Sequence, residues 1–262
     1  MVDPQIRFTD GAGYERMMGV WSRSAGDIFI DWLAPAKGLR WVDIGCGNGA
    51  FTELLVDRCA PAEVQGVDPS EPQLAFARTR PASRLAQFQV GDAMTLPFPD
   101  SLFDAATMAL VIFFVPDPAK GVAEMARVVK PGGTVAAYAW DMHGGGFPHE
   151  PILAEMRAMG NKPPSPPSVD ASRIEAMQSL WSGAGLEAIE TRQIHVQRTF
   201  ADFDDVWATF GMSPTVRAAV SAMTTDDLES LKSRVRARLP AGADGRITYG
   251  ARANAVKGRV PK

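Results

Sequence analysis

The feature that most constrains the fold of this chain is a glycine-rich loop between a strand and a helix. Residues 43–49 read Asp-Ile-Gly-Cys-Gly-Asn-Gly and follow a short apolar run, residues 40–44. Apolar residues then recur at helical spacing over residues 51–59. Glycines let a backbone turn sharply and approach a ligand closely, and a helix N-terminus presents unpaired N–H groups. The loop therefore predicts a ligand-binding turn between a buried strand and a helix.

Strands and helices alternate along the rest of the chain. The sequence predicts strands at 40–44, 64–67, 88–90, 103–110, 134–140, 186–197 and 246–256, with helices between most of them. A helix begins near a possible capping box at Ser70, and the helix after residue 117 is expected to end at the Lys-Pro-Gly-Gly segment 130–133. This alternation predicts a mostly parallel sheet, whose ligands bind outside the carboxyl ends of the strands.

Acidic residues directly follow the second and third expected strands. Asp68 lies 23 residues after Gly45, at a position where a carboxylate can accept hydrogen bonds from both hydroxyls of a ribose. Asp92 follows the third strand, where a carboxylate can accept a hydrogen bond from the adenine amine. For Asp68 alone, a helix-capping or turn role is an equal alternative. Three ligand-facing features after three successive strands predict a nucleoside-containing ligand.

Composition narrows the class of protein. The chain has 262 residues, of which 46% are hydrophobic, and this length suits one globular unit better than two full domains. A net charge of −3 disfavours a nucleic-acid partner. Two cysteines leave no disulfide framework or cysteine-rich metal site. The first 30 residues show no secretory signal, and the apolar run 105–115 is far below the ~20 residues of a membrane helix. We expect a cytoplasmic protein with no membrane span and no metal.

Five stretches resemble the class I S-adenosylmethionine-dependent methyltransferases, in the type-11 branch that includes ubiquinone-biosynthesis-like enzymes. The stretches are Trp41-Val-Asp-Ile-Gly-Cys-Gly-Asn-Gly-Ala-Phe51, Gly66-Val-Asp-Pro-Ser70, Gly91-Asp-Ala93, Leu96-Pro-Phe-Pro-Asp-Ser-Leu-Phe-Asp104 and Glu124-Met-Ala-Arg-Val-Val-Lys-Pro-Gly-Gly133. They cover about residues 35–141 in the expected order. The resemblance implies a Rossmann-like, doubly wound α/β fold with a seven-stranded, mostly parallel sheet and an antiparallel last strand. It also implies S-adenosyl-L-methionine as cofactor and S-adenosyl-L-homocysteine as product.

The resemblance assigns the cofactor to particular residues. The glycine loop would hold the methionine part, the acid after the second strand the ribose, and the Asp-Ala pair after the third strand the adenine. An Arg or Tyr in the N-terminal segment would bind the cofactor carboxylate. The alternative is that this segment only packs against the core and binds no ligand. The candidate cofactor-binding residues are Tyr14, Arg23, Asp43, Gly45, Cys46, Gly47, Gly49, Asp68, Pro69, Asp92, Ala93, Leu110 and Val111.

Methyl transfer needs a general base only when the acceptor must lose a proton. Asp141, His143 and His149 follow the fifth expected strand and are the candidate catalytic residues. Each histidine lies in a Gly-rich loop, and the alternative is that it is a solvated surface residue. Related enzymes often carry polar residues around positions 113 and 114, where this chain has Phe113 and Phe114. That departure predicts an apolar wall there.

We expect a single methyltransferase domain over residues 1–262. Its expected parts are an N-terminal helical cap (1–34), a cofactor-binding core (35–141), lid insertions that cover the substrate (142–170 and 200–240) and closing strands (186–197 and 246–256). The apolar second half favours a small, partly hydrophobic acceptor over a polymer. A homodimer is compatible with such a fold.

Two other functions stay open at this point. Gly45, Gly47 and Ala50 satisfy the Gly-x-Gly-x-x-Gly/Ala pattern of dinucleotide-binding proteins, so an NAD(P)-dependent oxidoreductase is one alternative. The charge of Asp43 at the strand end and the lack of a second dinucleotide-binding half speak against it. The other alternative is a non-catalytic module that binds S-adenosylmethionine.

Overall fold

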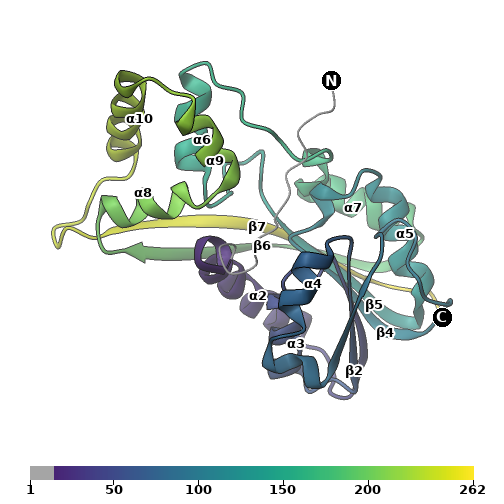
Figure 1. Ribbon diagram of the computed structural model, residues 1–262. Helices are drawn as coiled ribbons and strands as arrows, with labels where there is room; N and C mark the ends of the chain where they lie inside the picture. The colour runs from purple at the N-terminus through teal and green to yellow at the C-terminus, as the bar shows by residue number, and fades with distance from the viewer. Residues whose placement is uncertain (1–14) are drawn as a thin grey trace.

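The computed structural model describes residues 15–262, which form a seven-stranded sheet in the order β3-β2-β1-β4-β5-β7-β6 (Figure 1). β7 is antiparallel to both of its neighbours, and the remaining pairs are parallel. The strands are β1 (Arg40–Ile44), β2 (Glu63–Asp68), β3 (Ala86–Val90), β4 (Phe103–Ala109), β5 (Val129–Trp140), β6 (Glu187–Phe200) and β7 (Ile247–Arg259). This topology confirms the expected Rossmann-like α/β fold with an antiparallel last strand.

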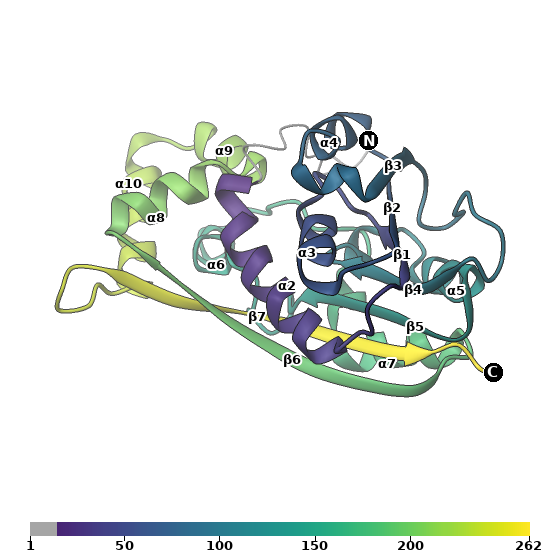
Figure 2. The same ribbon diagram turned by 90° about the horizontal axis from the view of Figure 1, so that it is seen from below.

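Helices cover both faces of the sheet (Figure 2). α2 (Val20–Leu33) contacts α3 (Ala50–Cys59), and α5 (Pro118–Val128) contacts α7 (Ile174–Gly183). The other helices are α4 (Glu71–Ala77), α6 (Glu150–Ala158), α8 (Phe203–Gly211), α9 (Pro214–Ser221) and α10 (Thr225–Arg238). Short helical turns are η1 (Glu15–Gly19), η2 (Pro81–Arg84), η3 (Ile112–Phe114) and η4 (Val169–Ser172).

Aromatic side chains anchor helices to the two faces of β5. The ring of Tyr138 lies 4.6 Å from that of Phe29 in α2 and 5.8 Å from that of Phe51 in α3, measured between centroids. The indole N–H of Trp181 in α7 donates to the carbonyl oxygen of Val135 at 2.9 Å. All four side chains are buried, so each helix is held by apolar area, and α7 also by a satisfied indole donor.

β5 begins earlier than the sequence predicts. The Lys-Pro-Gly-Gly segment was expected to lie before a strand at 134–140, but it belongs to β5 itself. The pairing with β4 shifts register between Phe103 and Ala105, so extra residues bulge out of the ladder. Gly132 adopts a φ of +79°, which glycine accommodates at such a bulge.

β6 and β7 extend beyond the rest of the sheet as a two-stranded ribbon. They pair from Phe200–Ile247 to Glu187–Arg259, whereas β5 pairs with β7 only from Ala253 onward. β6 runs past its predicted end because residues 198–200 pair with residues 247–249 of β7, whereas β7 runs past its predicted end because residues 257–259 pair with β5. The ribbon leads into α8, α9 and α10, which we call the lobe (Figures 1 and 2). α6 packs against α10, and Arg238 donates to Glu155 at 3.0 Å.

Candidate functional site

The glycine loop turns between β1 and α3 through three glycines with positive φ. The φ values are +71° at Gly45, +53° at Gly47 and +79° at Gly49. The backbone N–H groups of Gly45 and Cys46 donate to the carbonyl oxygen of Val67 at 2.7 and 3.1 Å. A Cβ at Gly45 would lie 2.5 Å from Val111, so the loop passes the end of β4 too closely for any side chain there.

Asp68 at the end of β2 is tied to the glycine loop by its carboxylate. Oδ2 accepts from the Gly47 N–H at 2.9 Å, and Oδ1 accepts from the Ser70 N–H at 2.8 Å. Burial raises the pKa of Asp68, and the two backbone donors partly oppose that rise. Ser70 occupies the N-cap of α4, but its side chain makes no capping hydrogen bond, so the predicted capping box is wrong. The backbone of Ser70 instead helps to orient the acid.

Asp43 is a second carboxylate at this edge of the sheet, and it is 1% exposed. Its Oδ2 accepts from the Thr52 hydroxyl at 2.6 Å, while its Oδ1 is buried with no hydrogen-bond partner in the described part of the chain. Burial raises the pKa of Asp43 to about 7, the Thr52 hydrogen bond opposes this, and the Asp68 charge adds to it. Burial also raises the pKa of the Cys46 thiol well above its ordinary value, so this side chain stays protonated.

Asp92 and Ala93 follow β3 at the same edge. The exposed Asp92 carboxylate accepts from the Met94 N–H at 2.8 Å, which folds a tight turn there. Leu110 follows β4 with a φ of +62°, and its N–H donates to the Tyr138 carbonyl at 2.8 Å. Because β3, β2, β1 and β4 are neighbours in the sheet, their carboxyl ends place these residues side by side. Pro69 is exposed next to the Asp68 carboxylate.

Comparison with known proteins agrees with this geometry. Residues 42–137 match a family model described as a methyltransferase domain. A 2-phytyl-1,4-naphtoquinone methyltransferase of Synechococcus elongatus is 36% identical over 144 residues, which are 53% of this chain and 58% of that protein. A demethylmenaquinone methyltransferase of Thermus thermophilus is 38% identical over 115 residues, 43% of this chain and 50% of that protein.

The chain is therefore similar to methyltransferases over residues 42–137. It spans about half the length of the curated relatives that it matches. Among solved structures, the YcgJ protein from Bacillus subtilis superposes with a TM-score of 0.61 at 22% identity, over 91% of this chain and 98% of that one. A Haemonchus contortus phosphoethanolamine N-methyltransferase gives a TM-score of 0.59 at 18% identity, over 95% of this chain and 57% of that one. These structures share the fold of the methyltransferase domain.

The three candidate catalytic residues follow β5 and lie in different surroundings. Asp141 is buried and forms an ion pair with Arg252 of β7, with its Oδ2 2.9 Å from Nε and 2.5 Å from Nη2. Its Oδ1 accepts from the Gly144 N–H at 2.9 Å. His143 is partly exposed, and its Nε2 lies 2.8 Å from Oδ1 of Asp170 in η4. Asp141 and His143 therefore already have partners in the loop after β5.

His149 is enclosed rather than solvated, so the loop-surface interpretation is wrong for this residue. It is 2% exposed and lies between the rings of Phe147 and Phe210, at centroid distances of 5.3 and 5.4 Å. Its Nε2 has no partner among the described residues. Burial lowers the pKa of His149 to about 4, and the positive charge of Arg198 contributes to that shift. The imidazole is therefore neutral at physiological pH.

The N-terminal candidates lie at the margin of the described structure. Tyr14 falls outside the described residues. Arg23 is exposed on α2 and forms no ion pair within residues 15–262. The neighbouring Trp21 is buried against Tyr249, with ring centroids 5.1 Å apart, so part of this segment does pack on the sheet.

The predicted apolar wall lies in η3, directly after β4. Phe113 is buried and its ring lies 4.6 Å from that of Phe114. The Ser168 N–H donates to the Phe113 carbonyl at 3.0 Å, which holds the segment before η4 against η3. The end of the lid expected at 142–170 is therefore fastened beside this wall.

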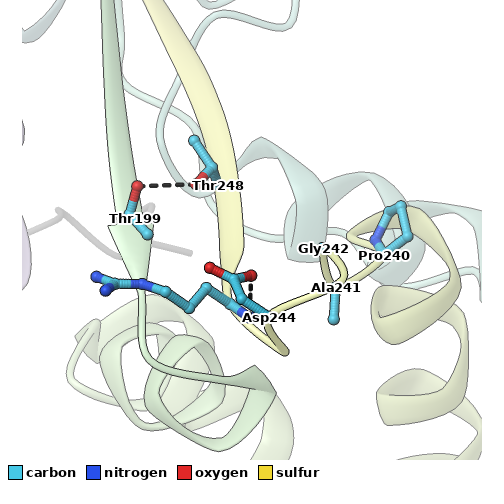
Figure 3. A pocket seen from close by; sticks show the side chains of 7 residues that line it. Thr199, Pro240, Ala241, Gly242, Asp244 and Thr248 are labelled. Atoms are coloured by element: carbon cyan, nitrogen blue, oxygen red, sulfur yellow. Dashed lines mark hydrogen bonds between the residues drawn. The ribbon is translucent and has the colours of Figure 1, made fainter.

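The described residues also contain a hollow of about 510 Å³ at the end of the ribbon, lined by Thr199, Pro240, Ala241, Gly242, Asp244, Arg246 and Thr248 (Figure 3). The Thr199 and Thr248 hydroxyls are 2.8 Å apart and satisfy each other, and Asp244 accepts from the Arg246 N–H at 3.1 Å. No glycine loop or strand-end acid faces this hollow. We therefore place the candidate site at the carboxyl edge of the sheet.

Sequence reasoning missed the residues that hold the loops from a distance. Thr52, Arg80 and Arg252 contact Asp43, the glycine loop and Asp141, respectively. No local pattern marks them, because Arg80 and Arg252 reach partners that are far away along the chain. In residues 15–262, no group of three or more His, Cys, Asp or Glu side chains is arranged to hold a metal ion. No helix in the same range is long and apolar enough to span a membrane.

Proposed function

We propose that this chain transfers the methyl group of S-adenosyl-L-methionine to a small-molecule acceptor. The observation that carries the proposal is the hydrogen bond from the Gly47 N–H to the Asp68 carboxylate. It places an acid suited to binding a ribose beside a glycine loop at one edge of the sheet. The loop would hold the methionine part, with Leu110 and Val111 beside it. Asp68 with Pro69 would bind the ribose, and Asp92 with Ala93 the adenine.

The buried acid at the end of β1 fits the same cofactor. Oδ1 of Asp43 is a buried acceptor without a partner in the described chain, and an ammonium group of a bound amino acid is a donor that would satisfy it. Three neighbouring positive-φ glycines leave room for a ligand close to the backbone. Arg23 and Tyr14 stay candidates for the cofactor carboxylate.

The strand order does not favour the oxidoreductase alternative. A dinucleotide-binding Rossmann sheet has two βαβαβ halves in the order 3-2-1-4-5-6, all parallel. Here the antiparallel β7 is inserted between β5 and β6, so the second half is not formed. The glycine pattern at Gly45, Gly47 and Ala50 therefore suits a ligand with one nucleoside better than a dinucleotide with two.

The mechanism that follows is one of orientation. The glycine loop, Asp68 and Asp92 would hold S-adenosylmethionine, which would supply an electrophilic methyl group for in-line transfer to an acceptor. The chain contributes a fixed loop, the apolar wall of Phe113 and Phe114, and exclusion of water. A proton acceptor is required only for hydroxyl or carbon acids. Of the three candidates, His149 has an Nε2 without a partner in the described chain, but its lowered pKa makes it a weak proton acceptor.

The acceptor class rests on the second half of the chain. The proposed single domain consists of a cap (1–34), a core (35–141), lid insertions (142–170 and 200–240) and closing strands (186–197 and 246–256). The contact between α6 and α10 joins the two insertions, which supports a common cover for a small, partly apolar acceptor. Two relatives are named for quinone substrates, and a quinone is therefore a sensible first acceptor to assay. We also propose a cytoplasmic location, a substrate other than nucleic acid and a homodimer. Light scattering tests the homodimer.

Isothermal titration with S-adenosylhomocysteine tests the proposal. We expect micromolar binding by the wild-type chain and about 10- to 100-fold weaker binding by Asp68→Ala, which loses hydrogen bonds to a charged group. Asp57→Ala is the matched control, because Asp57 is an exposed acid on α3. Absence of binding by the wild type, or binding of NADH in its place, would refute the proposal. Turnover with an acceptor panel separates an enzyme from a non-catalytic binding module.

A further inference from the structure

Arg80, which follows α4, joins three separate segments through one guanidinium group. Nε donates to the Asn48 carbonyl oxygen in the glycine loop at 2.6 Å. Nη1 donates to Glu53 in α3 at 2.8 Å, and Nη2 donates to Glu15 in η1 at 2.6 Å. The Arg80 and Glu53 side chains are 12% and 16% exposed, so this charge-assisted pair is largely desolvated, whereas the Glu15 side chain is 42% exposed.

The loop residue Asn48 is held from both sides. Its side-chain amide donates to Oε2 of Glu15 at 3.2 Å, the same oxygen that Arg80 contacts. Its side-chain oxygen accepts from the Ala50 N–H at 3.2 Å. A Cβ at Gly49 would lie 3.4 Å from Cδ of Arg80, so the arginine stem passes directly over the loop. Asn48 lies between two glycines with positive φ, at the centre of the turn.

We infer that Arg80, Glu15 and Asn48 form a clasp that positions the glycine loop for the cofactor and couples this loop to the N-terminal segment. The inference rests on the proposed function and deepens it. Arg80 acts through Asn48 and is a positioning residue, since its contact with the loop is the hydrogen bond to the Asn48 carbonyl. When the clasp is closed, the segment that begins at Glu15 and the loop hold each other in place. Loss of either partner frees the loop to leave the conformation with three positive-φ glycines.

The clasp differs from an ordinary surface ion pair in where it acts. Arg58, at the opposite end of α3, also binds two carboxylates of the N-terminal helix, Asp27 at 2.5 Å and Asp31 at 2.6 Å. Arg58 touches no loop residue and is more exposed than Arg80. Arg58→Met therefore removes the same kind of link between N-terminal segment and core without altering the glycine loop, and it is the matched control.

The test is a double-mutant cycle with Glu15→Gln and Arg80→Met in the full chain. S-adenosylhomocysteine affinity is measured by titration calorimetry and its dissociation rate by stopped flow. We expect about tenfold weaker binding and faster dissociation for Arg80→Met, and about threefold weaker binding for Glu15→Gln. We expect the double variant to be no weaker than Arg80→Met, because both changes open one clasp. Arg58→Met should bind within twofold of the wild type.

The outcomes separate the clasp from the proposed function. If the wild type binds no S-adenosylhomocysteine, the proposed function fails and the clasp fails with it. If the wild type binds but Arg80→Met binds equally well, only the clasp is overturned; additive single effects, or an equal loss in Arg58→Met, overturn it too. Glu15 is the more exposed partner, so Glu15→Gln should fold even if Arg80→Met does not. In that case Arg80→Lys, which keeps one charge but not the fork, should show the same non-additivity with Glu15→Gln.

Discussion

Replacing Asp43 by asparagine removes a buried negative charge while keeping the side-chain size and an acceptor for the Thr52 hydroxyl. In the folded chain the pKa of Asp43 is about 7, against an ordinary 3.8 that applies once the chain unfolds. Between these values the folded state holds a proton that the unfolded state has released. The free energy of unfolding therefore falls as pH rises through this window.

The size of the effect follows from the pKa difference. Each pKa unit corresponds to about 1.4 kcal/mol, so the whole change is about 4 kcal/mol. About 3 kcal/mol of it falls between pH 5 and pH 8. For a chain of this size, that loss lowers the melting temperature by about 6–12 °C relative to a variant that lacks the group. The stability of Asp43→Asn relative to the wild type should therefore increase as pH rises.

The assay is thermal unfolding of both chains at pH 5 and pH 8 without added cofactor, with Asp57→Asn, an exposed position on α3, as control. We expect Asp43→Asn to be the more stable chain at pH 8, and its advantage to shrink at pH 5. Under the proposed function, S-adenosylhomocysteine should bind the wild type more tightly at pH 8 than at pH 6, because its ammonium favours the ionised acid. Parallel pH profiles for wild type and Asp43→Asn would refute the reasoning.

Three further changes give definite expectations. Gly45→Ala places a Cβ 2.5 Å from Val111 at a φ of +71°, so titration calorimetry should show at least about tenfold weaker S-adenosylhomocysteine binding. The pKa of His149 is lowered from 6.5 to about 4, so the folded chain loses about 3 kcal/mol of stability as pH falls from about 6.5 to 4. His149→Leu lacks this group, so its melting temperature should change less with pH over the same range. Trp181→Phe leaves the Val135 carbonyl without its indole donor, and urea unfolding should show a loss of about 1–3 kcal/mol.

The candidate cofactor edge was predictable from sequence because its signals are local. The glycine loop and the acid that follows each of β2 and β3 lie within a few residues of a strand end, and parallel strands bring such ends together. The antiparallel direction of β7 was implied by the family resemblance and not by the residues of the strand. The continuation of β7 to Arg259 depends on pairing with β5, which no pattern within 246–256 indicates.

The remaining features depend on contacts between residues far apart in sequence. Arg252 binds Asp141 across 111 positions, and Arg80 binds Glu15 across 65. An arginine on a strand or after a helix has the same local signature whether it is solvated or paired. His149 shows the same limit, because its Gly-rich surroundings indicate a surface loop while Phe210 of the lobe encloses it. Such partners are decided by packing between elements.

The ribbon of β6 and β7 separates the lobe from the seven-stranded sheet. Beyond Trp140, β7 has lost its partner β5, and only two strands lead to the lobe. Two-stranded ribbons twist more strongly than wide sheets, so the twist of this ribbon sets the direction in which the lobe projects. The ribbon forms no backbone hydrogen bonds with β1, β2, β3 or β4. An engineer could therefore exchange the helices at its tip by grafting at Phe200 and Ile247, leaving the register of the glycine-loop strands untouched.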